Sequence, residues 1–292
     1  MSLFYKYSNP LTIYDFSNCF MSSNFGIPNN LLVISAFEKV IRDSGINTRG
    51  TILQRSIQLL AYADDIDIVG RTKQDVIETF TALENAAKVM GLTVNEEKTK
   101  LMVVSSRVHD VQSLRIGNYT FEGVTQFKYL GTLVTNKNDI KVEIRNRLLM
   151  ANRCYFGLKN QLKSKFLSIS TKVNLYKTLI RPIILYGSET WAINKTEENR
   201  LLIFERKILR SIFGAVKENN TWRSLYNHEV YNKYGQPNIL KVIKSYRIRW
   251  LGHVFRREDS DPVKKLTFSK IEGTRRRGRP VTRWLDSVEK KC

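Results

Sequence analysis

Short apolar runs separated by turn residues dominate residues 51–135. The runs Ile57–Tyr62 and Ile66–Val69 predict two buried strands, joined by the acidic turn Ala63-Asp64-Asp65. Residues 1–36 show no clear period, although the apolar stretch Leu31–Ile41 is compatible with a short helix that ends at the turn Asp43–Gly45. Three further runs with turn residues at both ends predict additional strands, at Leu101–Val104, Leu114–Ile116 and Phe127–Val134.

One helix stands between these strands. Thr72 followed by Asp75 matches a capping box, which marks a helix start. Gly91 stands where a helix C-terminus is expected. An apolar stripe runs through Ile77, Phe80, Leu83, Ala87 and Met90. Strands and helix together predict an α+β unit with a mainly antiparallel sheet.

From Asp139 onward the apolar spacing becomes helical. Ile140, Ile144 and Leu148 share one face, and the stretches Val173–Leu185 and Leu201–Phe213 predict two more helices. The pattern predicts a connector over residues 217–240, followed by a basic region to residue 292. No internal repeat is visible.

Charge separates the two halves of the chain. Residues 1–150 carry 17 basic and 15 acidic residues, a net charge of +2, whereas residues 151–292 carry 31 and 12, a net charge of +19. Such asymmetry favours a polyanionic partner, most simply nucleic acid. An acidic membrane surface would attract the same charge, but no run of ~20 apolar residues predicts a membrane span.

Cysteine and histidine are scarce. Cys19, Cys154 and Cys292 lie far apart, and there are three histidines, so a disulfide framework and a structural zinc site are not expected. This usage is typical of an intracellular protein. The start of the sequence lacks a signal-peptide pattern, and the basic run Arg275–Arg279 is compatible with nuclear import.

The turn Asp64-Asp65 is the feature with the clearest chemistry. Two adjacent carboxylates repel each other unless a cation compensates them. Hard divalent cations such as Mg²⁺ prefer such oxygen ligands, and a metal pair can promote in-line phosphoryl transfer. The alternative is a solvated turn, in which aspartate is common for conformational reasons.

Several ordered motifs resemble non-LTR (LINE-type) retrotransposon reverse transcriptases, over about residues 25–292. Tyr62-Ala63-Asp64-Asp65 resembles the catalytic Tyr-x-Asp-Asp box. Downstream blocks follow in the family's order: Gly91–Lys100, the primer-grip-like Phe127-Lys128-Tyr129-Leu130-Gly131, Tyr186–Trp191, and the tail Gly278-Arg279-Pro280 with Arg283, Trp284 and Asp286.

The resemblance implies an RNA-directed DNA polymerase that uses Mg²⁺ or Mn²⁺, with an RNA template, a DNA primer and deoxynucleoside triphosphates as partners. Asp64 would be a metal ligand, with Asp65 beside it. Lys98 would donate a proton to the leaving pyrophosphate, or be a solvent-exposed turn lysine. Phe127, Tyr129 and Gly131 would shape the primer-holding hairpin, although the aromatics are equally compatible with a core.

Two departures from the family qualify this expectation. Asp15 lies in a segment similar to the family's Asp-x-x-x-Ala-Phe box, which supplies a metal ligand, but the following Phe25–Pro28 comes too early; a plain loop aspartate is the alternative. Nothing between Pro28 and Phe37 matches the family's Gly-x-x-Gln-Gly box. We therefore expect a C-terminal part of such an enzyme with an internal deletion and weak or absent activity; the alternative is a non-catalytic, nonspecific nucleic-acid-binding remnant.

The C-terminal region contains a cluster of arginines. Arg275, Arg276, Arg277, Arg279 and Arg283 could each neutralise a phosphate, and Trp284 is expected to anchor a short helix from Arg283 to Glu289. A resemblance to an AT-hook is a further alternative for Arg277–Pro280. The expected regions are a truncated palm or fingers part (1–50), a palm (51–135), a helical thumb (136–216) and a basic C-terminal region (217–292).

Overall fold

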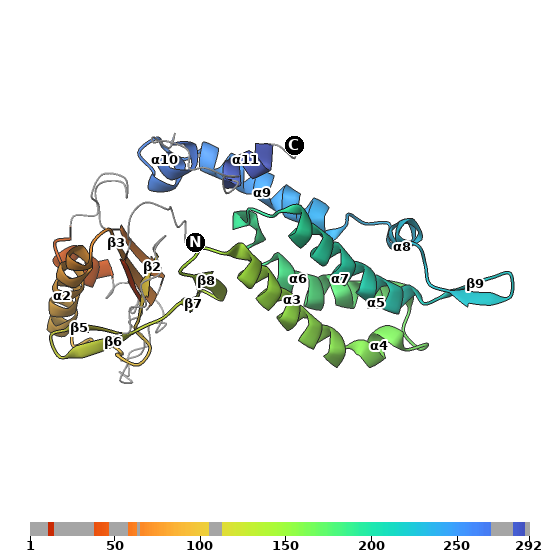
Figure 1. Cartoon of the computed structure of the whole chain (residues 1–292), viewed down its shortest axis with the longest axis horizontal. Helices are drawn as coiled ribbons and strands as arrows, with labels where there is room; N and C mark the ends of the chain where they lie inside the picture. Colours follow the sequence, from red (N-terminus) through yellow and green to blue (C-terminus); the bar gives the residue numbers. More distant parts are fainter. Residues whose placement is uncertain are drawn as a thin grey trace, which may run out of the picture. The chain divides into compact units, whose positions relative to one another are not determined.

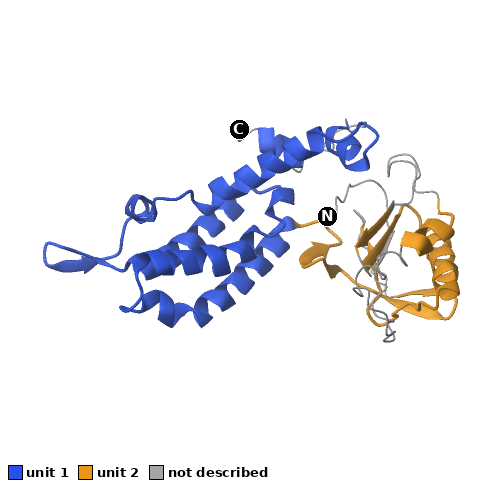
Figure 2. Cartoon of the chain, turned by 180° about the vertical axis from the view of Figure 1, so that it is seen from behind, with its two compact units in different colours: residues 1, 140–292 blue, residues 2–139 orange. Residues whose placement is uncertain are grey.

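The computed structural model describes residues 11–14, 38–46, 58–62, 65–104, 113–269 and 283–289. The chain divides into two compact units, coloured orange for residues 2–139 and blue for residues 140–292 in Figure 2. The first unit combines a sheet with helices, and the second consists mainly of helices. The mixed class of the fold is therefore confirmed, and the division into four regions stays a prediction.

A six-stranded sheet organises the first unit (Figure 1). Its strands are β1 (Leu11–Tyr14), β2 (Gln58–Tyr62), β3 (Asp65–Gly70), β4 (Lys100–Val103), β5 (Ser113–Ile116) and β6 (Tyr119–Gly123). They lie in the order β2-β3-β1-β4-β6-β5, with β4 and β6 parallel and the other pairs antiparallel. Strands β2, β3, β4 and β5 coincide with predicted strands, whereas the sequence pattern predicts no strand at β6. The sequence predicts no element at β1, which lies inside the sheet.

Helix α2 (Lys73–Val89) covers one face of this sheet. The capping box predicted at its start is present: the Thr72 hydroxyl accepts from the Asp75 amide at 3.1 Å, and the Asp75 carboxylate accepts from the Thr72 amide at 3.0 Å. Phe80 and Leu83 are buried against Ile66 and Ile68 of β3. Phe80, Leu83 and Ala87 of the predicted apolar stripe therefore fix α2 to the sheet, whereas Met90 is exposed and Val76, outside the predicted stripe, is buried.

Strands β7 (Gln126–Tyr129) and β8 (Thr132–Thr135) form a separate hairpin. Its loop residues Leu130 and Gly131 both have positive φ angles, 43° and 79°. A two-residue loop of this kind matches the right-handed twist of the flanking strands. The hairpin packs through Tyr129 onto Met102 of β4.

The second unit is a helical assembly closed by short C-terminal helices. One stretch within it, Tyr176–Ile180, is a π-helix, labelled η2. The other elements are α3 (Ile140–Gly157), α4 (Lys159–Lys163), α5 (Ile169–Leu175), α6 (Arg181–Leu185), η3 (Ser188–Thr190), α7 (Lys195–Phe213), β9 (Val216–Glu218), β10 (Thr221–Arg223), α8 (Asn227–Tyr234), α9 (Ile239–Phe255), α10 (Pro262–Phe268) and α11 (Trp284–Glu289).

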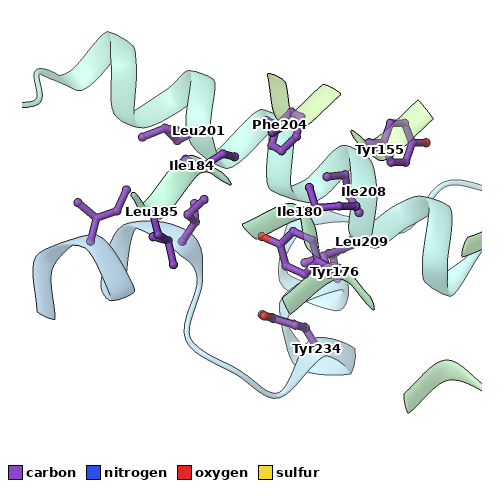
Figure 3. Packing of buried hydrophobic residues seen from close by; sticks show 14 of the residues in the cluster. Tyr155, Tyr176, Ile180, Ile184, Leu185, Leu201, Phe204, Ile208, Leu209 and Tyr234 are labelled. Atoms are coloured by element: carbon purple, nitrogen blue, oxygen red, sulfur yellow. The ribbon is translucent and has the colours of Figure 1, made fainter. Parts of the chain in front are cut away.

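One apolar core joins α3 to α9 within this unit. Figure 3 shows Ile184, Leu201, Phe204 and Ile208 among its buried side chains. Val230 of α8 and Ile239 of α9 belong to the same core. The stretch 217–240, for which the sequence pattern predicts a connector, therefore contains a packed helix.

A buried carboxylate ties four elements of the second unit together. Glu205 of α7 is fully buried and accepts hydrogen bonds from the Tyr176 hydroxyl at 2.9 Å, the Tyr231 hydroxyl at 3.2 Å and the Ile239 amide at 3.0–3.1 Å. Burial raises the pKa of Glu205, while these donors act in the opposite direction. Burial and the neighbouring Glu205 also raise the pKa of Tyr231 to about 12.

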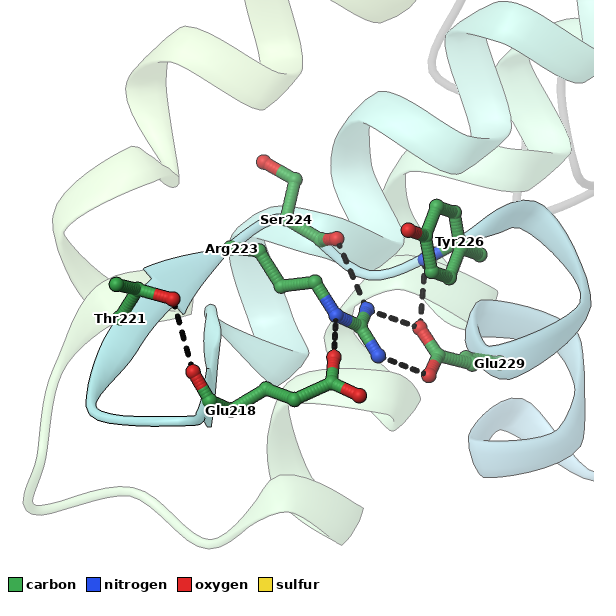
Figure 4. A network of polar contacts seen from close by, with 6 residues as sticks. All are labelled: Glu218, Thr221, Arg223, Ser224, Tyr226 and Glu229. Atoms are coloured by element: carbon green, nitrogen blue, oxygen red, sulfur yellow. Dashed lines mark hydrogen bonds and ion pairs between the residues drawn. The ribbon is translucent and has the colours of Figure 1, made fainter.

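The hairpin β9–β10 projects from the helices of this unit (Figure 1) and is fastened by a second polar network (Figure 4). Arg223 donates two hydrogen bonds to the Glu229 carboxylate, each of 2.8 Å, and pairs with Glu218 as well. The Tyr226 amide donates to Glu229 at 2.7 Å. These contacts fix the hairpin to the start of α8.

The C-terminal helix α11 is anchored as the sequence predicts. The Trp284 indole N–H donates to the Glu189 carbonyl at 2.7 Å, and Val288 is buried. The buried Arg247 of α9 donates to the Ser287 hydroxyl at 2.8 Å. Within the described residues, no helix is long and apolar enough to cross a membrane.

Replacing Glu205 by alanine should strongly destabilise the second unit. The substitution leaves the buried Tyr176 hydroxyl, the half-buried Tyr231 hydroxyl and the buried Ile239 amide without their acceptor, and each orphaned group costs ~1–3 kcal/mol. We expect the free energy of unfolding, measured by urea denaturation, to fall by at least ~3 kcal/mol. The exposed Glu258→Ala is the control and should change it by less than ~0.5 kcal/mol. Similar losses for both variants would contradict the assignment.

The Arg223–Glu229 pair should produce a measurable pH dependence. Hydrogen bonds from Arg223 and the Tyr226 amide lower the pKa of Glu229 to about 2. Because the folded-state pKa lies below the ordinary value, this contribution is present above pH ~4.5 and is lost as the pH falls toward 2. An NMR titration of the Glu229 carboxyl should find a midpoint near 2 in the wild type, and a clearly higher midpoint in Arg223→Ala. Equal midpoints would show that the pair does not set this pKa.

Candidate active site

The acidic hairpin presents its carboxylates on the face of the sheet opposite α2. Successive residues of a strand point to opposite faces, so burial of Ile66 and Ile68 under α2 directs Asp65 and Asp67 to the other face. Asp65 is half-buried and Asp67 is buried. Tyr62, which pairs with Asp65, is 65% exposed. The pattern of β3 thus separates a core face from an acidic face.

Tyr129 of the β7–β8 hairpin lies near these carboxylates. Burial raises its pKa strongly, and the negative charges of Asp67 and then Asp65 raise it further. Of the primer-grip residues predicted from the sequence, Tyr129 is buried, Phe127 is half-buried and Gly131 occupies the hairpin loop. The core alternative therefore holds for Tyr129. The structure brings this hairpin to the acidic face.

The register of the sheet brings three strand ends to one edge. Tyr14, the last residue of β1, pairs with Asp67 on one side and with Lys100, the first residue of β4, on the other. The end of β1 therefore lies beside the starts of β3 and β4. In sequence, Asp15 follows β1 directly and Asp64 precedes β3 directly. Both aspartates lie outside the described residues.

Lys98 lies in a turn that leads into β4. Its amide donates to the Asn95 side-chain oxygen at 3.1 Å, and its side chain is exposed. Because β4 starts at the edge where β1 ends, the Lys98 backbone lies just beyond that same edge. The turn and the exposure match the solvent-exposed alternative, and a role in catalysis stays a prediction.

The sequence analysis missed Asp67 and Lys100, which lie on the acidic face. The Lys100 ammonium pairs with Glu122 of β6 at 2.7 Å. The spacing of Asp65 and Asp67, two residues apart in a strand, was the available signal for a shared face.

The donor set of this face consists of carboxylates, which suit a hard divalent cation. Among the described residues, no group of three or more histidine, cysteine, aspartate or glutamate side chains is placed to hold a metal. Asp65 lies within the described part of the chain, whereas the other two predicted ligands, Asp64 and Asp15, do not. The metal site therefore stays a prediction.

The predicted basic tail is described only in part. Arg283 is exposed and immediately precedes α11. The remaining arginines predicted to contact phosphates, Arg275, Arg276, Arg277 and Arg279, lie outside the described residues.

Comparisons with known proteins show which families and relatives the chain is similar to. Residues 30–134 match the family described as reverse transcriptase (RNA-dependent DNA polymerase). This match includes the acidic hairpin and β7 with most of β8, and it begins after Asp15.

Relatives extend the similarity beyond that domain. An uncharacterised transposon-derived protein of Caenorhabditis elegans is 27% identical over 241 residues, which is 81% of this chain and 85% of the relative. The RNA-directed DNA polymerase from the mobile element jockey of Drosophila melanogaster is 25% identical over 172 residues, 56% of this chain. A jockey polymerase of Drosophila funebris is 21% identical over 178 residues.

The match spans 19% of the length of each jockey polymerase. Within this chain, the matched family domain contains the strands that form the acidic face. The chain is a relative of the reverse transcriptases of non-LTR retrotransposons, and residues 30–134 carry the reverse transcriptase domain.

Proposed function

We propose that the chain is an RNA-directed DNA polymerase of non-LTR retrotransposon type, with weak or no activity in its present form. The observation that supports this most directly is the sheet register, which places the end of β1 beside the starts of β3 and β4. Residues 51–135 would be the palm, residues 136–216 the thumb and residues 217–292 a basic extension. RNA template, DNA primer and deoxynucleoside triphosphates are the proposed substrates.

Asp64 and Asp65 would hold Mg²⁺ or Mn²⁺, together with Asp15, which follows β1 in sequence. When bound, two such ions lower the pKa of the primer 3′-hydroxyl and stabilise the leaving pyrophosphate. The half-buried position of Asp65 on the face opposite α2 supports this assignment, because a ligand must be both held and accessible. The negative charge of Asp67, on the same face of the sheet, would add to the attraction of the site for metal ions.

The other roles follow from the same edge of the sheet. Lys98 would donate a proton to the leaving pyrophosphate, from a turn that is open to solvent. The β7–β8 hairpin would hold the primer end, with Tyr129 as its fixed base and half-buried Phe127 as a contact. The rigid two-residue loop at Leu130 and Gly131 would keep the hairpin in register.

Weak activity is proposed because residues 29–36 contain no Gly-x-x-Gln-Gly box, which the family uses to contact nucleotide and template. A second candidate function is nonspecific nucleic-acid binding without chemistry. The net charge of +19 over residues 151–292 favours it. Both functions share binding to a template–primer, and they differ in the nucleotidyl transfer step.

Primer extension tests the polymerase proposal. On poly(rA)·oligo(dT) with Mg²⁺ or Mn²⁺, we expect slow extension that Asp64→Asn reduces about a thousandfold, since a lost metal ligand costs several kcal/mol of transition-state stabilisation. Asp15→Asn should reduce it similarly if Asp15 is a ligand. The exposed Asp43→Asn is the control and should retain full activity. If extension survives Asp64→Asn, the acidic hairpin is a turn without a catalytic role.

Template–primer binding tests the shared part of both functions. Affinity should fall at least a hundredfold between 50 and 200 mM salt, because each phosphate contact releases counterions. Replacing Arg275, Arg276, Arg277 and Arg279 by glutamine should flatten the salt dependence. This variant is better than a deletion of the tail, because Trp284 and Val288 anchor α11 by packing. Affinity that does not change with salt would contradict phosphate binding.

A further inference from the structure

The second unit contains a cavity of about 550 Å³ that the sequence motifs do not indicate. Side chains of α3, α4, α5 and α7 line it, together with the residues that follow α7 and β10. Four of the lining residues are cationic: Lys163, Lys172, Lys207 and Arg210. No acidic residue lies among the described residues that line it.

Lys172 makes this concentration of positive charge unusual. The residue is only 7% exposed, and its ammonium forms no ion pair or hydrogen bond with the described part of the chain. The ammonium is not among the buried side-chain atoms that lack a partner, so it reaches the open space of the cavity while the rest of the side chain is buried. The cavity therefore presents this positive charge to a ligand that enters it.

The two cations contributed by α7 are held by neutral groups. Lys207 donates to the Asn152 side-chain oxygen at 3.1 Å and lies 5.2 Å from the centre of the Tyr155 ring. Arg210 donates to the Leu225 carbonyl at 2.9 Å and to the Asn227 side-chain oxygen at 2.8 Å. These contacts orient the side chains and leave their positive charges free to attract an anion.

Ser211 supplies an independent observation. Its hydroxyl oxygen is buried, lines the same cavity and has no hydrogen-bond partner among the described residues. An unused buried donor is rare in folded proteins, since burial without a hydrogen bond costs free energy. A bound oxyanion would accept from this hydroxyl and compensate the lysines at the same time.

Exposed aromatic residues lie close in sequence to residues that line this cavity. Trp222 of β10 is 71% exposed, and Tyr226 is 57% exposed and stacks on His228 at 5.9 Å. Ser224, which lines the cavity, lies between the two aromatics in sequence. The Arg223 guanidinium lies 4.4 Å from the centre of the Tyr226 ring and holds it in place. Exposed rings beside a basic pocket suit bases and phosphates of a single strand.

We propose that this cavity binds a backbone phosphate of single-stranded nucleic acid, with adjacent bases stacked on Trp222 and Tyr226. The inference rests on the proposed nucleic-acid binding and specifies where the second unit makes it. The phosphodiester oxygens accept from Lys172, Lys207 and Ser211. Like most interactions with the nucleic-acid backbone, this one is independent of base sequence.

Fluorescence anisotropy of the full chain with a labelled 12-nucleotide oligo(dT) or oligo(rU) tests the site. Lys163→Gln/Lys207→Gln should weaken binding at least tenfold at 0.1 M salt and reduce the salt slope by about 0.7 for each phosphate that is no longer neutralised. Lys195→Gln/Lys233→Gln removes the same charge at exposed positions outside the cavity and should change the affinity less than twofold. Equal losses in both variants would overturn the site in favour of diffuse attraction.

Lys172→Met distinguishes a role of Lys172 in binding from a role in stability. The substitution removes the ammonium and keeps an apolar side chain in the buried part of the site, so the urea midpoint should not fall, while oligonucleotide affinity should drop about tenfold. A lower midpoint with unchanged affinity would contradict the proposal.

Trp222→Ala should weaken binding of the oligonucleotide at least fivefold by loss of base stacking.

Two further arms separate the possible sources of failure. Inorganic phosphate should displace the oligonucleotide only at millimolar concentrations; displacement at the oligonucleotide's own concentration would make the cavity a free-anion site instead. Failed primer extension with binding that still depends on Lys163 and Lys207 would count against polymerase activity alone, whereas extension with unaffected binding in the cavity variants would count against this site alone.

Discussion

The alternation of side chains along β3 is the constraint on which the reverse transcriptase unit depends. Ile66 and Ile68 must face α2 to form the core, and this leaves Asp65 and Asp67 on the opposite face. A shift of one residue in register would bury the carboxylates under α2 and expose the isoleucines. The same hydrophobic contacts that stabilise the fold therefore select the face on which chemistry can take place.

Much of this unit could be predicted because its signals are local. The capping box at Thr72, the central residues of the apolar stripe of α2 and four strands of the sheet all lie within short windows of sequence, and the structure confirms them. The acidic hairpin could be singled out because two adjacent aspartates between apolar strands are conspicuous. Its neighbours on the same face, Asp67 and Lys100, depend on strand register and were missed.

The features that escaped prediction depend on contacts between distant residues. β1 has four residues, and its partners in β3 and β4 lie more than fifty positions away. Glu205 is an ordinary acidic residue in an amphipathic helix until Tyr176, Tyr231 and Ile239 surround it. The basic cavity likewise assembles Lys172 and Lys207 from separate helices. The charge count indicates that the expected partner is an anion, but only the packing of the helices shows where the cationic side chains gather.

The position of β1 has a consequence for how such a chain can change in length. In sequence, 43 residues separate Tyr14, at the end of a strand inside the sheet, from Gln58, at the start of an edge strand, so both ends of this segment are held by strand pairing. The entropic cost of closing a chain segment between fixed ends grows only logarithmically with its length, by about 0.6 kcal/mol for each doubling. Outside core residues such as Val40, such a segment can change in length while the sheet persists, so persistence of the fold is a poor guide to persistence of catalysis.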